Sequence, residues 1–566
     1  MHYTLWDDLQ GVRFCAAIVI KMKFARKLVC PLLLVCLTLS TFASVEAQLA
    51  KVAWKAAQQL TKERRNEVKY NDEGFVTEVV ISNFPSGFMM GQLEVFPKLE
   101  SVTISTRYYF EDSNMGGVRK LKNLKSFAIR KSRYASGTCL ELLAEVPALE
   151  SLEIKSCSEI ESLQEVSRIR QLKTLKLDSS EAVSLAPLLE CRNLKAIELV
   201  RSSNVDDAAM KILGEIKTLE SIDLSYTSVT DEGLAELAKL PNLVELNLKH
   251  CQSITGESFA DFASPHPLKE LNLRDAVKLT DKGLNELARF KGLENLLLQG
   301  NKEVTGDGFQ FLADLKKLKL FSCPGTSVRD EHLKLMTGIE TLEVIWLPNC
   351  EAVSGRGLEC LTSSQSVIRI SLNECPKIDS PDFEVLAKFG NLDELYIAKT
   401  RIRNDGIEKL CELKKLRILD ISDNIWLGDP AFEKLQDSSV SKLIASGLRR
   451  LTNESFSSAL KMKKLENLTV TANKKLDGSG LQMLVGNTSL KSLTIEQPEH
   501  LSIEAFGFIR QIPKIEELSF SEGEIRISQI EQLAGMPNLR KFNYKIFGNG
   551  ARSEQLNAVL ESFPKL

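Results

Sequence analysis

The chain has 566 residues, with 73 basic and 75 acidic side chains and a formal net charge of −2. This near-even balance lacks the strong basic excess that is typical of nucleic-acid-binding proteins. A single compact core rarely exceeds about 250–300 residues, so the length favours either several domains or a repeat protein, in which each unit packs only against its neighbours.

The first part of the chain differs from the rest. Basic residues precede an apolar run at 28–39, and small residues follow it up to Gln48. This order is that of a secretory signal peptide, and the run is short for a transmembrane helix. We therefore expect residues 22–47 to be a cleaved signal and residues 1–21 to be a non-native or dispensable extension. A membrane anchor formed by an uncleaved signal is the alternative.

From residue 76 to residue 566 the pattern L-x-x-L-x-L recurs every 22 to 25 residues. An early copy starts at Val76, and the later copies start at Leu99, Leu124, Leu149, Leu172, Leu194, Leu219, Leu243, Leu268, Leu293, Leu318, Leu342, Val367, Leu392, Leu416, Val440, Leu465, Leu490, Ile515 and Leu539. A fixed period in this range predicts an α/β solenoid of about 20 leucine-rich repeats. Residues 48–75 contain an amphipathic stretch that we expect to form a helix capping the first repeat.

Each repeat has the same expected structure. Alternating apolar and polar residues predict a short strand with one buried face, and helical spacing follows after a Ser or Thr cap. Between them, eight residues after the first leucine, we expect an inward turn residue that forms a structural ladder: Cys157, Cys251, Asn301, Cys350, Cys375, Asn424 and Asn473. Stacking places a parallel sheet on the concave face of a curved horseshoe and helices on its convex face. Whether Cys350 and Cys375 form a disulfide is left open.

The repeats resemble a known class. The phrase T-D-x-G-L stands at Thr230–Leu234 and at Thr280–Leu284, and four repeats carry cysteine at the inward position. These motifs resemble the cysteine-containing leucine-rich repeats of F-box proteins and of secreted bacterial repeat proteins. About 28 residues separate the expected cleavage site from the first strand, too few for an F-box. A substrate-recognition subunit of a ubiquitin ligase therefore stays only an alternative.

Catalytic patterns are missing from the sequence. There are five histidines, none of them in a metal-binding spacing, and there is no phosphate-binding loop or nucleophile elbow. The His250–Cys251 pair is interpreted as a packed thiol, because Cys251 occupies the inward position. We therefore predict no enzyme activity, no cofactor and no metal.

The outward strand positions carry the functional prediction. Successive repeats in the middle of the chain place apolar or aromatic residues where polar ones are expected: Leu297, Leu320, Val344, Trp346, Tyr396, Ile418 and Ile444. Trp and Tyr are enriched at interaction hot spots, although packing between neighbouring strands is an alternative explanation. We expect a secreted or periplasmic recognition protein that binds a protein or peptide partner through its concave face, with inhibitor and adhesion roles open. Neither nucleic acid nor, after cleavage, a membrane is an expected partner. Self-association through the C-terminal edge is a further alternative.

Overall fold

The computed structural model describes Ala56 and residues 66–82, 90–105, 110–132, 134–157, 159–178, 184–202, 205–547 and 554–565. The predicted extension and the predicted signal peptide lie outside these residues, and so does the predicted capping segment 48–75 apart from Ala56 and residues 66–75. At the described end of that segment, Glu67–Tyr70 form a strand and not a helix. The chain divides into two compact units, residues 1–243 and 244–566. In the described part of the chain, no helix combines the length and the apolar character needed to cross a membrane.

Unit 1 is a sheet whose neighbouring strands are parallel except at its start, where β1 pairs antiparallel with β2. Its strands are β1 (Glu67–Tyr70), β2 (Val76–Ile81), β3 (Ser101–Ser105), β4 (Ser126–Arg130), β5 (Ser151–Lys155), β6 (Thr174–Asp178), β7 (Ala196–Val200) and β8 (Ser221–Asp223). The α-helices are α3 (Gly137–Leu143), α4 (Asp207–Leu213) and α5 (Asp231–Leu237), and the 3-10 helices are η1 (Met90–Val95), η2 (Asp112–Met115), η3 (Val118–Lys120), η4 (Gln164–Arg168) and η5 (Ala186–Glu190).

Unit 2 continues the pattern with parallel strands only. They are β9 (Glu245–Asn247), β10 (Glu270–Asn272), β11 (Asn295–Leu297), β12 (Leu320–Ser322), β13 (Val344–Trp346), β14 (Arg369–Ser371), β15 (Glu394–Tyr396), β16 (Ile418–Asp420), β17 (Lys442–Ala445), β18 (Asn467–Thr471), β19 (Ser492–Glu496), β20 (Glu517–Ser521) and β21 (Lys541–Asn543).

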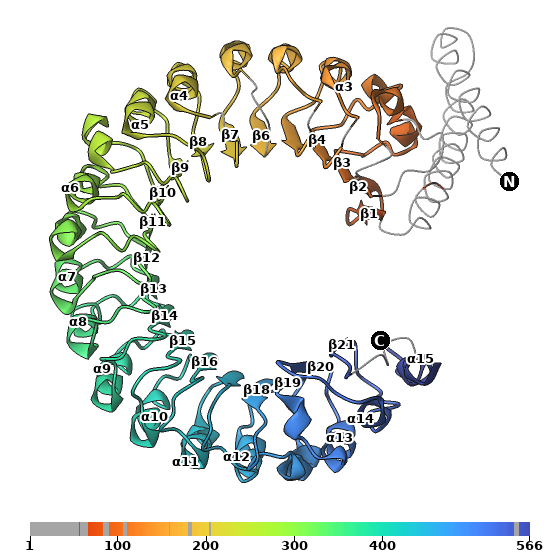
Figure 1. Cartoon of the computed structure of the whole chain (residues 1–566), viewed down its shortest axis with the longest axis vertical. Coiled ribbons are helices and arrows are strands. Elements are labelled where there is room, and N and C mark those ends of the chain that lie inside the picture. The colour runs from red at the N-terminus through yellow and green to blue at the C-terminus, as the bar shows by residue number, and fades with distance from the viewer. Residues whose placement is uncertain are drawn as a thin grey trace, which may run out of the picture. The chain divides into compact units, whose positions relative to one another are not determined.

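The helices of unit 2 alternate with these strands along the chain. The α-helices are α6 (Asp281–Asn285), α7 (Asp330–Leu335), α8 (Gly355–Glu359), α9 (Phe383–Leu386), α10 (Asn404–Leu410), α11 (Asp429–Lys434), α12 (Ser455–Lys461), α13 (Ile503–Arg510), α14 (Ile527–Glu531) and α15 (Glu554–Glu561). The 3-10 helices are η6 (Glu257–Asp261), η7 (Glu286–Arg289), η8 (Gly306–Ala313), η9 (Ser380–Asp382), η10 (Leu435–Asp437), η11 (Ser479–Gly486) and η12 (Pro498–His500). Within each unit the strands line the inner side of an arc and the helices its outer side (Figure 1).

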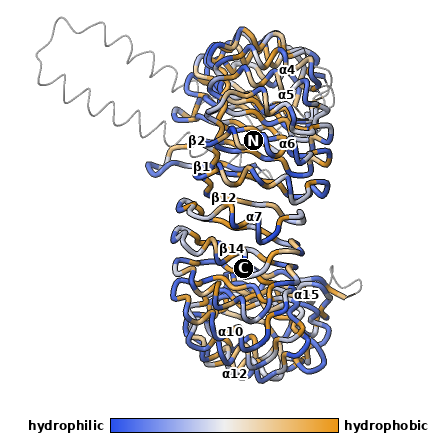
Figure 2. Tube along the Cα trace, turned by 90° about the vertical axis from the view of Figure 1, so that its left-hand side faces the viewer, coloured by the Kyte–Doolittle hydropathy of each residue, from blue (hydrophilic) through white to orange (hydrophobic). Residues whose placement is uncertain are grey.

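The apolar frame of the sequence forms the core between strands and helices. In a representative repeat Leu268, Leu271 and Leu273 are each at most 1% exposed. Figure 2 shows short hydrophobic and hydrophilic stretches alternating along the chain in both units, as expected when every repeat buries one face. The predicted leucine-rich repeat solenoid is thus confirmed within each unit.

The inward turn residues join each repeat to the one before it. The chain leaves most strands through a residue in the left-handed conformation, such as Asp423 with a φ of 56°, and the next side chain then points into the core. Asn424 is fully buried and donates to the carbonyl oxygens of Ile397 (2.9 Å) and Ile421 (2.8 Å). Its own oxygen accepts the Thr400 N–H at 2.8 Å. The amide therefore satisfies backbone groups of two repeats that water cannot reach.

Cysteines serve at the same position with weaker bonds. The thiol of Cys350 donates to the carbonyl of Cys323 at 3.3 Å, and that of Cys375 donates to the carbonyl of Leu347 at 3.1 Å. Every cysteine in the described residues is a free thiol, so Cys350 and Cys375 are unlinked in this structure. Burial raises the pKa of Cys375 to about 12, which keeps the thiol protonated and unreactive at neutral pH.

A second link on the helix side explains the recurring spacing inside the T-D-x-G-L motif and its variants. The carboxylate of Asp330 in α7 accepts the backbone N–H of Ser354 at 2.7 Å and its hydroxyl at 2.6 Å, which fixes the start of α8. A methyl group on Gly357 would lie 2.6 Å from the same carboxylate. Asp207 bonds Thr230 in the same way and lies against Gly233. The acidic residue of one repeat thus requires both the cap and the glycine of the next.

We expect Asn424→Ala to lower the free energy of unfolding by about 2–4 kcal/mol, because it leaves several buried backbone groups without partners. The matched control is Asn473→Ala. That side chain is half-buried and accepts only from the nearby N–H groups of Lys475 and Leu476, so we expect a loss below about 1 kcal/mol. Urea unfolding of the two variants measures the difference. Equal losses would contradict the proposed role of the buried ladder.

We expect Gly357→Ala to destabilise the protein by about 1–3 kcal/mol, because the added carbon meets both Asp330 and Leu333. Gly507→Ala, in α13, is the control. Its added carbon meets nothing within 4 Å, so we expect a gain of about 0.4–1 kcal/mol from the less flexible unfolded chain. The measurement is again urea unfolding, and a neutral Gly357→Ala variant would show that the glycine is not required by packing.

Candidate partner-binding surface

The seven residues predicted to bind a partner all lie on strands β11 to β17 of unit 2. Parallel pairing places them in two neighbouring rows, because equivalent residues of successive strands stand side by side. The first row, here called the aromatic row, contains Leu297, Ser322, Trp346, Ser371, Tyr396, Asp420 and Ile444. The second row contains Asn295, Leu320, Val344, Arg369, Glu394, Ile418 and Lys442.

Large and small side chains alternate along the aromatic row. The rings of Trp346 and Tyr396 lie two strands apart, yet their centroids are only 5.6 Å from each other, and the planes are inclined by 57°. Such contact is geometrically favoured for aromatic pairs. The residue between them in register is Ser371, which is completely buried, and Ser322 on the other side of Trp346 is 2% exposed.

The two serines are chemically unusual. Neither the Ser322 hydroxyl nor the Ser371 hydroxyl has a hydrogen-bond partner among the described residues. A buried hydroxyl without a partner costs about 1–3 kcal/mol, so small apolar residues would suit a purely structural face better. Because a serine side chain is short, it leaves space in which the large rings of the neighbouring strands can contact each other.

A charged cluster on the second row holds Tyr396 in place. The Tyr396 hydroxyl donates to Glu394 at 2.8 Å, and Glu394 also accepts two hydrogen bonds from Arg369, at 2.6 and 2.7 Å. These Arg369 bonds lower the pKa of the Glu394 carboxyl. Burial and then the bond to Glu394 raise the pKa of Tyr396 to about 12. The phenol is therefore a fixed neutral donor, and its ring orientation is set before any partner arrives.

The seven predicted residues are all half-buried rather than fully exposed. Contacts along the strands and between rings cover part of each side chain, so the packing explanation accounts for some of their apolar character. The indole N–H of Trp346 nevertheless finds no hydrogen-bond acceptor within the described residues.

The sequence pattern identified the apolar residues of this face but not the polar residues that hold them in place. Ser322, Ser371, Arg369 and Glu394 occupy outward positions of the same strands and are ordinary polar residues in the sequence. Aligning successive repeats position by position would have shown that serine alternates with large residues in one row. The hydrogen bonds from Tyr396 to Glu394 and from Arg369 to Glu394 depend on side-chain geometry that the pattern does not contain.

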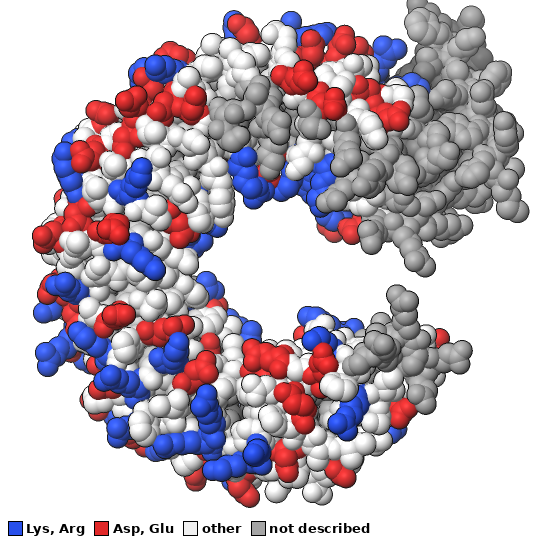
Figure 3. Space-filling view, in the orientation of Figure 1, with Lys and Arg blue, Asp and Glu red and all other residues white. Residues whose placement is uncertain are grey.

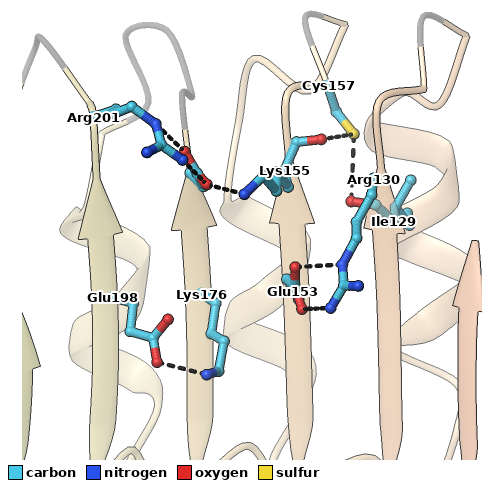
Figure 4. Close-up of polar contacts among 9 residues, drawn as sticks. Ile129, Arg130, Glu153, Lys155, Cys157, Lys176, Glu198 and Arg201 are labelled. Carbon is cyan, nitrogen blue, oxygen red and sulfur yellow. Dashed lines mark hydrogen bonds and ion pairs between the residues drawn. The ribbon is translucent and has the colours of Figure 1, made fainter. Parts of the chain in front are cut away.

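The strand face of unit 1 carries charged side chains that form ion pairs with one another across neighbouring strands. Arg130 and Glu153 form two hydrogen bonds of 2.6 and 2.7 Å between β4 and β5, and Lys176 and Glu198 approach to 2.5 Å between β6 and β7 (Figure 4). The carboxylate of Asp178 is shared between Lys155 on one side and Arg201 on the other. Cys157 lies beyond the end of its strand and donates to the Ile129 carbonyl at 3.8 Å.

No group of three or more His, Cys, Asp or Glu side chains in the described part of the chain could hold a metal ion. Of the adjacent His250 and Cys251, His250 approaches Asp275 at 3.2 Å and Cys251 is fully buried, as expected for a packed thiol.

The comparisons agree with the repeat architecture. Residues 216–238, which include all of β8 and all of α5, match the family model described as Leucine Rich repeat. The same leucine frame and the same strand-to-helix unit recur through both units. The chain is a leucine-rich repeat protein. Such folds are typically recognition scaffolds for protein partners and not catalysts.

Solved structures of leucine-rich repeat proteins include a similar chain. An internalin (inlF) from Listeria monocytogenes is 17% identical, with a TM-score of 0.39 over 61% of this chain and 86% of the internalin chain. At these values the similarity carries no functional argument. No curated protein sequence matches the chain.

We expect one tyrosine of the folded protein to ionise near pH 12 and to be missing from the titration of Tyr396→Phe. The folded pKa lies above the unfolded value of about 10, so the contribution of Tyr396 to stability is complete below about pH 10 and is lost as the pH rises towards 12. Ultraviolet absorbance of tyrosinate in the two proteins, with circular dichroism to follow folding, makes the measurement. Loss of a tyrosine that ionises near pH 10 would contradict the assignment.

Proposed function

We propose that this leucine-rich repeat protein is an exported, non-catalytic recognition module that binds a protein partner on the strand face of unit 2. The observation that carries the proposal is the aromatic row, where Trp346 and Tyr396 form a rigid pair over two buried serines whose hydroxyls are unpaired. The apolar residues Leu320 and Val344 stand beside this pair on the neighbouring row.

Preorganisation is the main physical support for this site. Binding requires interface side chains to lose rotamer freedom, at about 0.5–1.5 kcal/mol for each flexible one. Trp346 and Tyr396 already contact each other, and the Tyr396 hydroxyl is held by Glu394. A partner would therefore gain aromatic contact area without having to order these rings. A carbonyl of the partner would also satisfy the Trp346 indole N–H.

Unit 1 supports the same location by contrast. Its charged side chains are already paired between neighbouring strands, as with Arg130 and Glu153. A partner that covered them would have to remove their water without offering better ion pairs, which seldom gives net affinity. The apolar part of the aromatic row has no such penalty, because hydrophobic burial is favourable in itself.

Export and the specific role belong to the same proposal. Export rests on the sequence of residues 22–47, and a membrane anchor formed by an uncleaved signal remains the alternative. An inhibitor or an adhesion protein would use the same surface, and only the identity of the partner separates these roles. The ubiquitin-ligase alternative rests on the resemblance of the repeats alone.

The test is quantitative capture with immobilised residues 48–566 from the exported fraction of the native host. We expect a protein partner that the wild type retains and that the Trp346→Ala, Tyr396→Ala double variant binds at least about 30-fold more weakly, which corresponds to the loss of about 2 kcal/mol at a hot spot. Calorimetry or surface plasmon resonance with the purified partner gives the ratio.

The matched control removes apolar side chains of unit 2 that lie off this face. Met483 is 49% exposed in η11 and Ile503 is 44% exposed in α13, so their double alanine variant loses exposed apolar surface without touching the rows. It should bind like the wild type. A partner that both double variants retain equally would refute the proposed face, and capture of the chain alone would favour self-association through the C-terminal edge.

A further inference from the structure

A second surface of unit 2 lies on the loop between β16 and α11. Trp426 is 41% exposed and its neighbour Ile425 is 55% exposed, although Asn424 before them and Leu427 after them are fully buried. The flanking residues anchor the loop in the core, so the two large apolar side chains between them are held at the surface. Exposed tryptophan and isoleucine side by side are unfavourable in water unless something covers them.

Two arginines from the neighbouring repeats stack on this tryptophan. The guanidinium carbon of Arg403, one repeat before, lies 5.4 Å from the centre of the Trp426 ring, and that of Arg450, one repeat after, lies 4.9 Å from it. Both distances are in the range of cation–π contacts. Stacking uses the flat face of a guanidinium and leaves the N–H groups at its edge free to bind carboxylates.

Neither Arg403 nor Arg450 forms an ion pair with another described residue. Asp405 is near enough for Arg403 to contribute to lowering its pKa, but the first cause of that shift is the hydrogen bond from Ser380, and a second bond comes from Gly406. Along the outer side of each unit, basic and acidic residues are intermixed (Figure 3).

We propose that four residues, Arg403, Ile425, Trp426 and Arg450, form a docking site for an acidic segment of a protein partner. Carboxylates of the segment bind the stacked guanidinium groups of Arg403 and Arg450, and an apolar side chain between them covers Ile425 and Trp426. The apolar part favours a protein over a nucleic acid or a sulfated glycan, because those polymers offer no aliphatic side chain to Ile425. This site is separate from the aromatic row and does not depend on it.

The probe is a fluorescent peptide of about twelve residues that carries Asp and Glu on both sides of a central Leu-Phe, and it is titrated with the full chain. We expect saturable binding that weakens at least about tenfold in Trp426→Ala and in the Arg403→Ala, Arg450→Ala double variant. The same peptide with Asn and Gln in place of its acids should lose binding, as should the peptide with Ser in place of Leu-Phe.

The control variant is Lys463→Ala, Lys464→Ala, which also removes two exposed positive charges. These lysines lie just before the start of β18, whereas the proposed site lies after the end of β16. Its affinity should stay within about twofold of the wild type. Circular dichroism of each variant checks folding, and Trp426→Phe, which keeps an aromatic face, should retain most of the affinity. Equal binding by all variants, no saturable binding, or tighter binding of a heparin fragment or a single-stranded oligonucleotide than of the acidic peptide would overturn the proposal.

Discussion

Parallel pairing of strands in strict register is the constraint on which the rest of each unit depends. Each strand of unit 2 bonds to the next at equivalent positions, so any residue type that recurs in the repeat becomes a row across the sheet. Rows that point inward form the core, and rows that point outward form a continuous surface. A one-residue change of register would exchange the two faces, which is why the leucine frame tolerates so little variation.

Hydrogen bonds between consecutive repeats maintain this register outside the strands. On the strand side an inward amide such as Asn424 satisfies carbonyl groups of its own repeat and of the preceding one. On the helix side Asp330 holds the backbone and the hydroxyl of Ser354 in the following repeat. Buried polar groups of this kind are favourable only when every partner is present, so one incorrectly placed repeat would leave bonds unmade on both sides.

The two surfaces of unit 2 use this rigid frame differently. On the strand face, small buried serines stand beside two large rings that already contact each other. On the loop after β16, the buried Asn424 and Leu427 hold Trp426 outward, where arginines of both neighbouring repeats stack on it. In both cases folding has already fixed the large side chains, so binding a partner does not have to supply the entropy cost of ordering them. This lowers the cost of using them as hot-spot residues.

The sequence by itself determined the repeat, its period, the strand and helix in each unit, and the rows to which Trp346 and Tyr396 belong. These follow from local periodicity, because burial of one face per element needs only the order of apolar residues. Tertiary structure alone decided how Arg369 and Glu394 fix Tyr396, why Gly357 must lack a side chain, and that Arg403 and Arg450 meet on Trp426. Apart from the Tyr396–Glu394 bond within one strand, those contacts join residues about one repeat apart. Their geometry depends on side-chain rotamers that a linear pattern does not encode.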